Sequence, residues 1–289
     1  QQLKTISNVA VHRSFIRVSE VLNMSHSTVS LHIRSLEEEL GVPLVDRSSR
    51  PPTLTKDGFD LAEQASRVLD LIEGIKQRSN KHTIAGSLHI GVVPSASSLL
   101  VPQALQRFRA RYPEVEITIT NSLSQELAQQ VKAGKLDLAV TTEPRFPQHG
   151  LSIHHVATEP LYVLALGTCP ETDPLELLCN YPFIWFSRNT WVGQEIERQL
   201  DELGLSFPVN FEMDGLDAIA AMVRHGLGVS IVPKRVGEQN FHQELKAIPF
   251  GSPQHSRQLV MLRRKNDPLH HICDALLQEL KEVAGHPDA

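Results

Sequence analysis

The chain has 289 residues, of which 41% are hydrophobic and 21% are charged, a balance typical of a globular protein with room for about two domains. No apolar run reaches the roughly 18 to 20 residues that a membrane span needs. Residues 1–11 have neither the basic start nor the apolar centre of a secretory signal. These observations argue against disordered, fibrous and membrane proteins, and we expect a cytoplasmic protein without a membrane partner.

The net charge of −5 is distributed unevenly along the chain. Residues 1–80 carry 10 basic and 10 acidic side chains, so the negative excess belongs to the remaining residues. Residues 26–35 and 47–56 contain no acidic residue, and a phosphate backbone could approach both stretches. Charge alone does not identify a DNA-binding protein.

Neither the cysteines nor the histidines follow a metal-binding pattern. Cys169, Cys179 and Cys273 are far apart in the sequence, without CxxC spacing. The 14 histidines are scattered, and neighbouring histidines diverge on a strand or helix. We therefore expect no metal and no cofactor, and structural burial of the cysteines.

Three short helices are predicted in the first forty residues. Ser14 and Ser25 can cap the second and the third helix, and Gly41 with Pro43 ends the third. Each helix has an apolar stripe at helical spacing. The three stripes consist of Leu3, Ile6 and Ala10, of Phe15, Val18 and Leu22, and of Val29, Ile33, Leu36 and Leu40.

The third helix has a second face that is small, polar and free of acidic residues. At 100° per residue this face lies opposite the apolar stripe. Such a surface can enter the major groove of DNA, although an ordinary solvated helix face has the same pattern. The candidate DNA-binding residues on this helix are His26, Ser27, Thr28, Ser30, Leu31 and Arg34.

Residues 44–55 predict two short strands around a basic turn, as in the wing of a winged helix-turn-helix. Arg47 and Arg50 are the wing's candidate DNA-binding residues. Arg50 lies at the predicted tip, where it could reach a minor groove.

The first sixty residues closely resemble the N-terminal domain of LysR-type transcriptional regulators. The resemblance covers some forty-five positions, from Ser14-Phe15 through Val29-Ser30 and Glu37-Glu38-Glu39-Leu40-Gly41 to Leu54-Thr55 and Gly58. It implies a DNA-binding role for the third helix. Family members often have Gln-Pro where this chain has His26-Ser27, and Arg-Gln where it has Leu31-His32, so base preference cannot be transferred.

A long helix is predicted over residues 59–79. Its apolar residues repeat at 4-3-4-3 spacing, a heptad seam suited to a second helix, although the same stripe could lie on its own domain. We expect a dimer helix, and the family resemblance points the same way. The seam residues are Leu61, Ala65, Val68, Ile72 and Ile75.

After a polar hinge at residues 81–86, strands and helices alternate. Residues 87–140 and 183–232 each predict a β-α-β-α-β unit, and two apolar strands at residues 161–166 and 258–263 are placed to cross between the units. A last helix at residues 269–283 would return to the first unit. This order, with Gly134-Lys135-Leu136-Asp137 and Gly226-Leu227-Gly228-Val229, resembles the family's effector-binding region, which is similar in fold to periplasmic ligand-binding proteins.

The predicted organisation therefore has an all-α winged helix-turn-helix and a long dimerisation helix, followed by an α/β effector domain of two subdomains. The DNA-binding domain covers residues 1–58 and the dimerisation helix residues 59–80. Subdomain I covers residues 87–160 and 266–285, and subdomain II covers residues 161–265.

Ligands of open α/β units bind beyond the carboxyl ends of the strands, beside helix N-termini. Hydroxyl groups and one arginine follow the predicted strands, and they would converge on a cleft between the subdomains. Several of these hydroxyls could serve only as helix caps, and the arginine could be a solvated loop residue. The candidate effector-binding residues are Ser95, Ser97, Ser98, Ser124, Thr141, Thr142, Ser187 and Arg188, with Arg188 favouring an organic anion.

The sequence thus predicts a non-enzymatic transcription regulator, a dimer or tetramer that binds an interrupted palindrome in double-stranded DNA. A small-molecule effector would modulate this binding and so the contact with RNA polymerase. The alternatives are a cytoplasmic α/β enzyme or a solute-binding protein that uses the same cleft. The sequence shows no Gly-rich phosphate loop, nucleophile elbow or convergent carboxylate pair that would support the enzyme.

Overall fold

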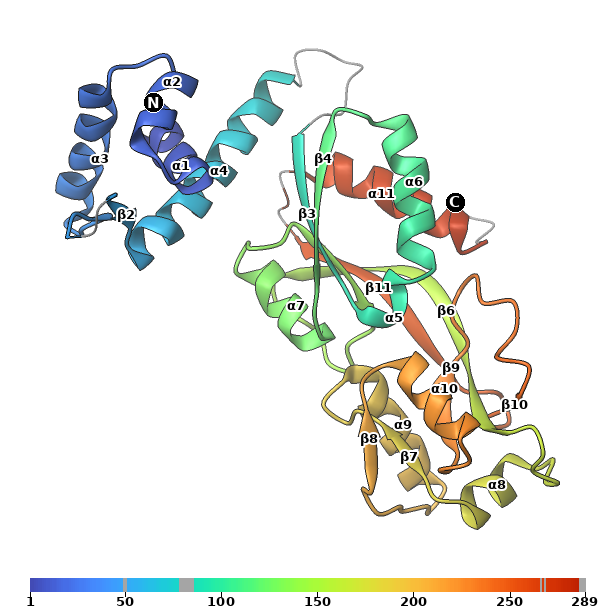
Figure 1. Cartoon of the computed structure of the whole chain (residues 1–289). Helices are drawn as coiled ribbons and strands as arrows, with labels where there is room; N and C mark the ends of the chain where they lie inside the picture. Colours follow the sequence, from blue (N-terminus) through green and yellow to red (C-terminus); the bar gives the residue numbers. More distant parts are fainter. Residues whose placement is uncertain (49–50, 78–85, 266, 268, 286–289) are drawn as a thin grey trace. The chain divides into compact units, whose positions relative to one another are not determined.

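A computed structural model describes residues 1–48, 51–77, 86–265, 267 and 269–285 (Figure 1). The chain divides into two compact units, Gln1–Gly86 and Ser87–Ala289. Each unit has its own hydrophobic core, so each is described by itself.

The first unit is a winged helix-turn-helix followed by a long helix. Its helices are α1 (Gln2–His12), α2 (Phe15–Val21), α3 (His26–Leu40) and α4 (Lys56–Gln77), and the wing pairs β1 (Val45–Asp46) with β2 (Thr53–Leu54) antiparallel. The predicted caps are confirmed: Ser14 Oγ accepts from the Arg17 N–H, Ser25 Oγ accepts from the Thr28 N–H, and Gly41 ends α3 at φ 71°.

Helix α4 begins three residues earlier than predicted. The Thr55 hydroxyl accepts a hydrogen bond from the Gly58 N–H at 3.0 Å and donates to the Pro43 carbonyl, so Thr55 caps the helix and ties it to the wing. Helix α4 packs against α1. Ala62 and Ala65 are buried in the unit's own core, and Leu61 packs against it.

The second unit has two lobes built on one seven-stranded sheet. The strand order is β10-β6-β11-β5-β3-β4, and β9 also pairs with β6. The strands are β3 (Gly86–Val92), β4 (Val115–Asn121), β5 (Leu138–Thr142), β6 (Leu151–Leu166), β9 (Ser230–Pro233), β10 (Leu245–Pro249) and β11 (Ser256–Arg264). In the second lobe β7 (Ile184–Phe186) and β8 (Phe211–Met213) form a parallel pair.

Strand β6 runs through both lobes. Its residues up to Pro160 pair with β11, whereas Leu161–Leu164 pair with β9 on one side and Tyr162–Leu166 pair with β10 on the other. The predicted crossover strand at residues 161–166 is therefore only the last part of a 16-residue strand. Strand β11 pairs with β5 as well as with β6, so it lies in the sheet of the first lobe although residues 161–265 were predicted to form the second.

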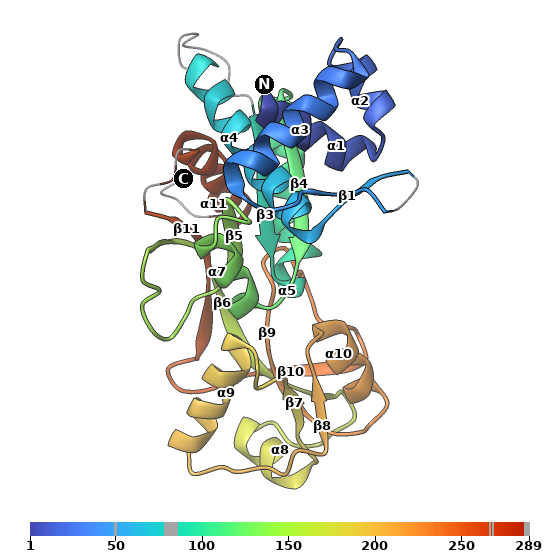
Figure 2. The same cartoon turned by 90° about the vertical axis from the view of Figure 1, so that its left-hand side faces the viewer.

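The helices divide between the lobes, as Figures 1 and 2 show. The first lobe carries α5 (Pro94–Ser97), α6 (Leu100–Arg111), α7 (Ser124–Lys132) and α11 (His270–Val283), and the second carries α8 (Pro174–Asn180), α9 (Trp191–Glu202) and α10 (Leu216–Arg224). As predicted, α11 returns to the first lobe, where it packs against α6 and Arg107 Nε donates to Glu279 Oε2 at 2.9 Å. Three elements, α5, α8 and β10, were not predicted from the sequence.

Candidate nucleic-acid interface and ligand cavity

Helix α3 buries three of the four residues of its predicted apolar stripe, leaves Leu40 exposed, and exposes the predicted DNA-binding face. Val29, Ile33 and Leu36 are buried in the core of the first unit. The predicted residues opposite the stripe, Ser27, Ser30, Leu31 and Arg34, are exposed. Of the two candidates at the N-terminal end, His26 is exposed and Thr28 is half-buried. The Ser27 and Thr28 hydroxyls both lie within hydrogen-bond distance of Ser25 Oγ, so they also support the N-terminal cap.

Glu37 fixes the wing against α3. Its Oε1 accepts from the N–H groups of Leu44 and Val45 at 2.9 and 3.2 Å, and its Oε2 accepts from Arg47 Nη2 at 2.7 Å. Burial alone would raise the pKa of Glu37, but the hydrogen bonds from Arg47, Leu44 and Val45 outweigh burial and lower the pKa below its usual value. Glu37 was not predicted as a site residue because its partners lie seven to ten residues away.

A groove of about 460 Å³ lies between α3 and the wing. Its walls bring together four of the predicted DNA-binding residues, His26, Ser30, Arg34 and Arg47, with Phe15, Pro51 and Pro52 among the apolar residues beside them. The Arg34 and Arg47 side chains therefore reach the same concave surface. The wing-tip candidate Arg50 lies outside the described residues.

A small cavity lies between the two lobes of the second unit. The first lobe contributes Val93, Pro94, Ser95, Leu123, Ser124, Thr142 and Arg257 to its walls, and the second contributes Phe186, Thr190, Val192 and Asp214. Its volume is about 20 Å³, enough for about one water molecule. Three of the eight predicted effector-binding residues, Ser95, Ser124 and Thr142, line it.

Arg257 is the arginine of this cavity, and it was not predicted from the sequence. Arg257 lies directly across from Glu159 on the neighbouring antiparallel strand. Its Nε donates to Glu159 Oε2 at 2.7 Å and its Nη2 donates to Ser95 Oγ at 3.0 Å. Both charged side chains are 1% exposed. Since the two residues are separated by 98 positions, no local sequence pattern predicts the pair.

The structure places Arg188 outside the lining of the cavity. Its Nη1 forms an ion pair with Glu197 at 3.2 Å, and the guanidinium carbon lies 5.3 Å from the centre of the Trp185 ring. The backbone N–H of Arg188 donates to Glu212. Arg188 is therefore engaged within the second lobe, and the expectation that it faces the hydroxyls of the first lobe is corrected.

The remaining effector candidates are not brought into the cavity lining. The Thr141 hydroxyl is fully buried and donates to the Thr142 carbonyl, and the Ser97 hydroxyl donates to the Pro94 carbonyl. Ser98 Oγ accepts from Arg235 Nη1 at 3.3 Å. The Ser187 carbonyl accepts from the hydroxyl of Thr190, the N-cap of α9. Ser95 and Ser97 lie in α5, a single turn of four residues.

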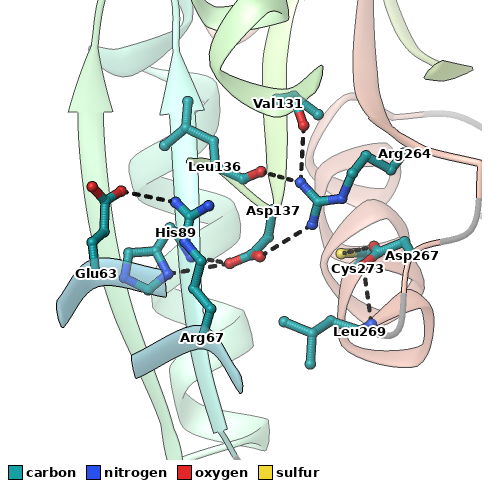
Figure 3. A network of polar contacts seen from close by, with 10 residues as sticks. All are labelled: Glu63, Arg67, His89, Val131, Leu136, Asp137, Arg264, Asp267, Leu269 and Cys273. Carbon is teal, nitrogen blue, oxygen red and sulfur yellow. Dashed lines mark hydrogen bonds and ion pairs between the residues drawn. The ribbon is translucent and has the colours of Figure 1, made fainter. Parts of the chain in front are cut away.

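A separate polar network in the first lobe has a structural role (Figure 3). Asp137 accepts from the His89 N–H at 2.8 Å and lies 3.6 Å from Arg264 Nη2. Arg264 Nη1 donates to the carbonyls of Val131 and Leu136. These contacts join β3 and β11 to the last turn of α7 and to the turn between α7 and β5.

Asp267, also in Figure 3, holds the buried thiol of Cys273. It accepts from Cys273 Sγ at 3.1 Å and from the Leu269 N–H at 3.0 Å. Burial and the neighbouring carboxylate raise the pKa of the Cys273 thiol far above its usual value. Cys273 therefore has little thiolate character.

Neither a metal centre nor a membrane-spanning helix is found among the described residues. No group of three or more His, Cys, Asp and Glu side chains there is arranged to hold a metal ion. In the same part of the chain, no helix is both long and apolar enough to cross a membrane.

A winged helix-turn-helix unit joined to a two-lobed α/β unit with a cavity between its lobes defines a class, the effector-binding transcription regulators. The family described as "bacterial regulatory helix-turn-helix protein, lysR family" matches residues 1–59, and the family described as "LysR substrate binding domain" matches residues 81–285. The chain belongs to the LysR family of transcription regulators, which carry a DNA-binding domain and an effector-binding domain.

Similar proteins and structures come from the same family. The chain is 25% identical to a "hydrogen peroxide-inducible genes activator" of Pectobacterium carotovorum, over 98% of this chain and 95% of the relative. It is 28% identical to the regulator IlvY of Escherichia coli, over 92% and 88%. A full-length OxyR variant of Pseudomonas aeruginosa has a TM-score of 0.68 at 24% identity, over 97% of this chain and 93% of that structure. Full-length CbnR in complex with its target DNA has a TM-score of 0.64 at 21% identity, over 98% of this chain and 99% of that structure.

Proposed function

We propose that this regulator binds promoter DNA as a dimer, or as a tetramer built from dimers, through α3 and the wing. The exposed acid-free face of α3, with Arg34 and Arg47 on one groove, is the observation that carries this proposal. A dimer presents two such faces and therefore recognises an interrupted palindrome. The protein acts in the cytoplasm, where it meets the promoter and RNA polymerase.

The second half of α4 supplies the dimer seam. Val68 and Ile72 are 42% and 44% exposed, and neither belongs to the core that contains Ala65. Two apolar side chains one helical turn apart on an exposed helix are suited to a partner helix. The side chain of Ile75 lies outside the described residues, and Leu61 and Ala65 contribute to the unit's own core.

Control by a small molecule acts through the cavity between the lobes. A ligand that contacts both walls changes the balance between separated and closed lobes, because its affinity differs between the two states. That change alters the spacing of the paired DNA-binding units and hence promoter binding. Noncovalent binding suits this chain better than thiol oxidation, because Cys273 has a raised pKa and neither Cys169 nor Cys179 lines the cavity.

The test of DNA binding is a gel shift with the DNA that flanks the protein's own gene, at several salt concentrations. We expect binding that weakens steeply with salt, because the groove meets phosphates through Arg34 and Arg47. The matched comparison is the same experiment with Arg109→Ala, an exposed arginine of α6 in the other unit, which should leave binding unchanged. Absence of binding by the wild-type protein to any flanking DNA would refute the proposal.

A further inference from the structure

The charges around the cavity between the lobes define the chemistry of its effector. We infer that the effector is a small zwitterion with one carboxylate and one ammonium group, as in an α-amino acid. This inference rests on the proposed function of the cavity, and it replaces the organic anion that Arg188 had suggested.

The first-lobe wall is suited to a carboxylate. The Arg257 residue is 3% exposed, and its Nε and Nη2 are used by Glu159 and Ser95. Its Nη1 makes no hydrogen bond within the described part of the chain, so this N–H donor of a buried, cavity-lining residue is available to a ligand. A charged donor that reaches a carboxylate forms a short and strong hydrogen bond.

Two further groups support a carboxylate at this wall. Ser124 and Thr142 line the cavity, are 4% and 5% exposed, and form no side-chain hydrogen bond among the described residues. Ser124 is the first residue of α7, a helix of nine residues whose N-terminus has no side-chain cap. The free N–H groups of that first turn favour a negative charge beside Ser124.

A ligand with a carboxylate alone does not match the charges around the cavity, because Glu159 already neutralises Arg257. The buried Glu159 and Arg257 side chains form a paired unit without net charge. Asp214 adds a negative charge on the opposite, second-lobe wall, and it forms no ion pair within the described residues. A simple anion would therefore be repelled by Asp214, whereas a ligand ammonium group would pair with it.

Binding of such a ligand requires the lobes to separate. A cavity of about 20 Å³ holds about one water molecule, which is less than the volume of any amino acid. Arg257 bonds Ser95 of the first lobe, and its partner Glu159 accepts from the Val236 N–H of the second lobe at 2.9 Å. The ion pair thus joins both lobes in the described state, and a zwitterion that contacts Arg257 and Asp214 stabilises a state with a wider cavity.

The test measures binding of amino acids and matched analogues to the full-length protein by thermal shift and calorimetric titration. The panel contains the common L-amino acids, their N-acetyl derivatives without the ammonium group, their amides without the carboxylate, and polyols. We expect one or more amino acids to stabilise the protein, and the N-acetyl and amide forms of the same compound to bind at least ten-fold more weakly.

The variant Asp214→Asn tests the contact with the ligand ammonium group and leaves the other groups of the site in place. Because Asp214 is exposed, this variant should unfold at the wild-type temperature in the absence of ligand. Its affinity for the amino acid should fall ten-fold or more, with little change for the N-acetyl form. The matched control is Asp201→Asn, an exposed position of α9 outside the cavity lining, which should bind like the wild type.

Several results would overturn the inference. They are stabilisation by polyols or by carboxylic acids without an ammonium group at the affinity of amino acids, unchanged binding by Asp214→Asn, and no response to any amino acid at millimolar concentration. If the protein still shifts flanking DNA in those cases, the zwitterion is wrong and the proposed DNA-binding function stands. Loss of the gel shift as well would refute the proposed function itself.

Discussion

Glu159 and Arg257 face each other across the antiparallel strands β6 and β11 and form a buried ion pair within the sheet of the first lobe. Glu159→Gln leaves the buried guanidinium without a full counter-charge, so we expect a loss of about 3–5 kcal/mol in the free energy of unfolding. Urea unfolding followed by circular dichroism measures this loss. Replacement of both side chains, Glu159→Leu with Arg257→Met, should recover most of the lost free energy of unfolding. Equal losses in the single and double variants would show that Glu159 and Arg257 do not stabilise the fold as a pair.

Arg34 is predicted to contact DNA phosphate. Arg34→Ala should weaken DNA binding at every sequence and reduce the slope of log affinity against log salt by about 0.9. Leu31→Arg should strengthen binding generally, because it adds a cation to the same exposed face of α3. Gel shifts over a salt series measure both effects. Identical affinities and slopes in Arg34→Ala and the wild type would remove α3 from the interface.

Replacement of Glu37 distinguishes two effects of this residue on DNA binding, its negative charge and its role in orienting the wing. Removal of an acidic group near DNA should strengthen binding if only charge mattered. Because Glu37 holds Leu44, Val45 and Arg47, we expect Glu37→Ala to weaken binding several-fold instead. Gel shifts with both proteins at one salt concentration measure the difference, and tighter binding by the variant would contradict a positioning role.

The pKa of Glu37 also predicts a pH dependence. Its pKa is lowered in the folded protein, so its contribution to stability is present above the unfolded value of 4.5 and is lost as the pH falls through the lowered pKa. Thermal unfolding between pH 6 and pH 3 should show a smaller loss of melting temperature in Glu37→Gln than in the wild type. Equal losses in the two proteins would show that Glu37 is not the group responsible.

Val68 and Ile72 are predicted to form the dimer seam. Val68→Glu and Ile72→Glu should dissociate the dimer, because a two-fold interface would bury each carboxylate twice at a cost of several kcal/mol. Both side chains are exposed in the single chain, so the protomer should remain folded. Sedimentation measures the mass, and circular dichroism checks the fold. An unchanged mass would place the oligomer contact elsewhere.

His154 predicts a loss of stability in mildly acidic solution. Burial lowers the pKa of His154, and Arg263 Nε donates to its Nε2 at 3.1 Å, which requires the neutral ring. A lowered folded pKa means that the unfolded chain binds more protons below pH 6.5, so stability falls as the pH falls below that value. His154→Gln should reduce the difference in melting temperature between pH 7.5 and pH 5.5. A difference equal to that of the wild type would assign this pH dependence to other groups.

Local signals explain why most of the first unit could be predicted from the sequence. Ser14, Ser25 and Gly41 act within one helical turn, and such caps depend little on distant residues. The missed helix α8 also had a local signal, because Asp173 caps it and Pro174 occupies its first position. The first half of β6 was not predicted, because polar residues such as His154, His155 and Thr158 interrupt the apolar pattern expected of a strand.

The residues of the cavity depend on contacts that are distant in sequence. Ser95, Ser124 and Thr142 were identified because they follow strands of a predicted α/β unit. Arg257 was missed because only the pairing of β6 with β11 brings it beside Glu159 and then Ser95, which is 162 positions away. Arg188 was favoured from its place after β7, but Glu197 and the Trp185 ring engage its side chain.

Effector-controlled DNA binding through α3 can be tested in one footprint of the DNA that flanks the protein's own gene, with and without a ligand that stabilises the protein. We expect two protected half-sites with dyad symmetry, loss of protection with Arg34→Ala, and an altered spacing or occupancy when the ligand is added. A wild-type protein that protects no flanking DNA, or whose footprint is identical in Arg34→Ala and unaffected by the ligand, would contradict this mechanism.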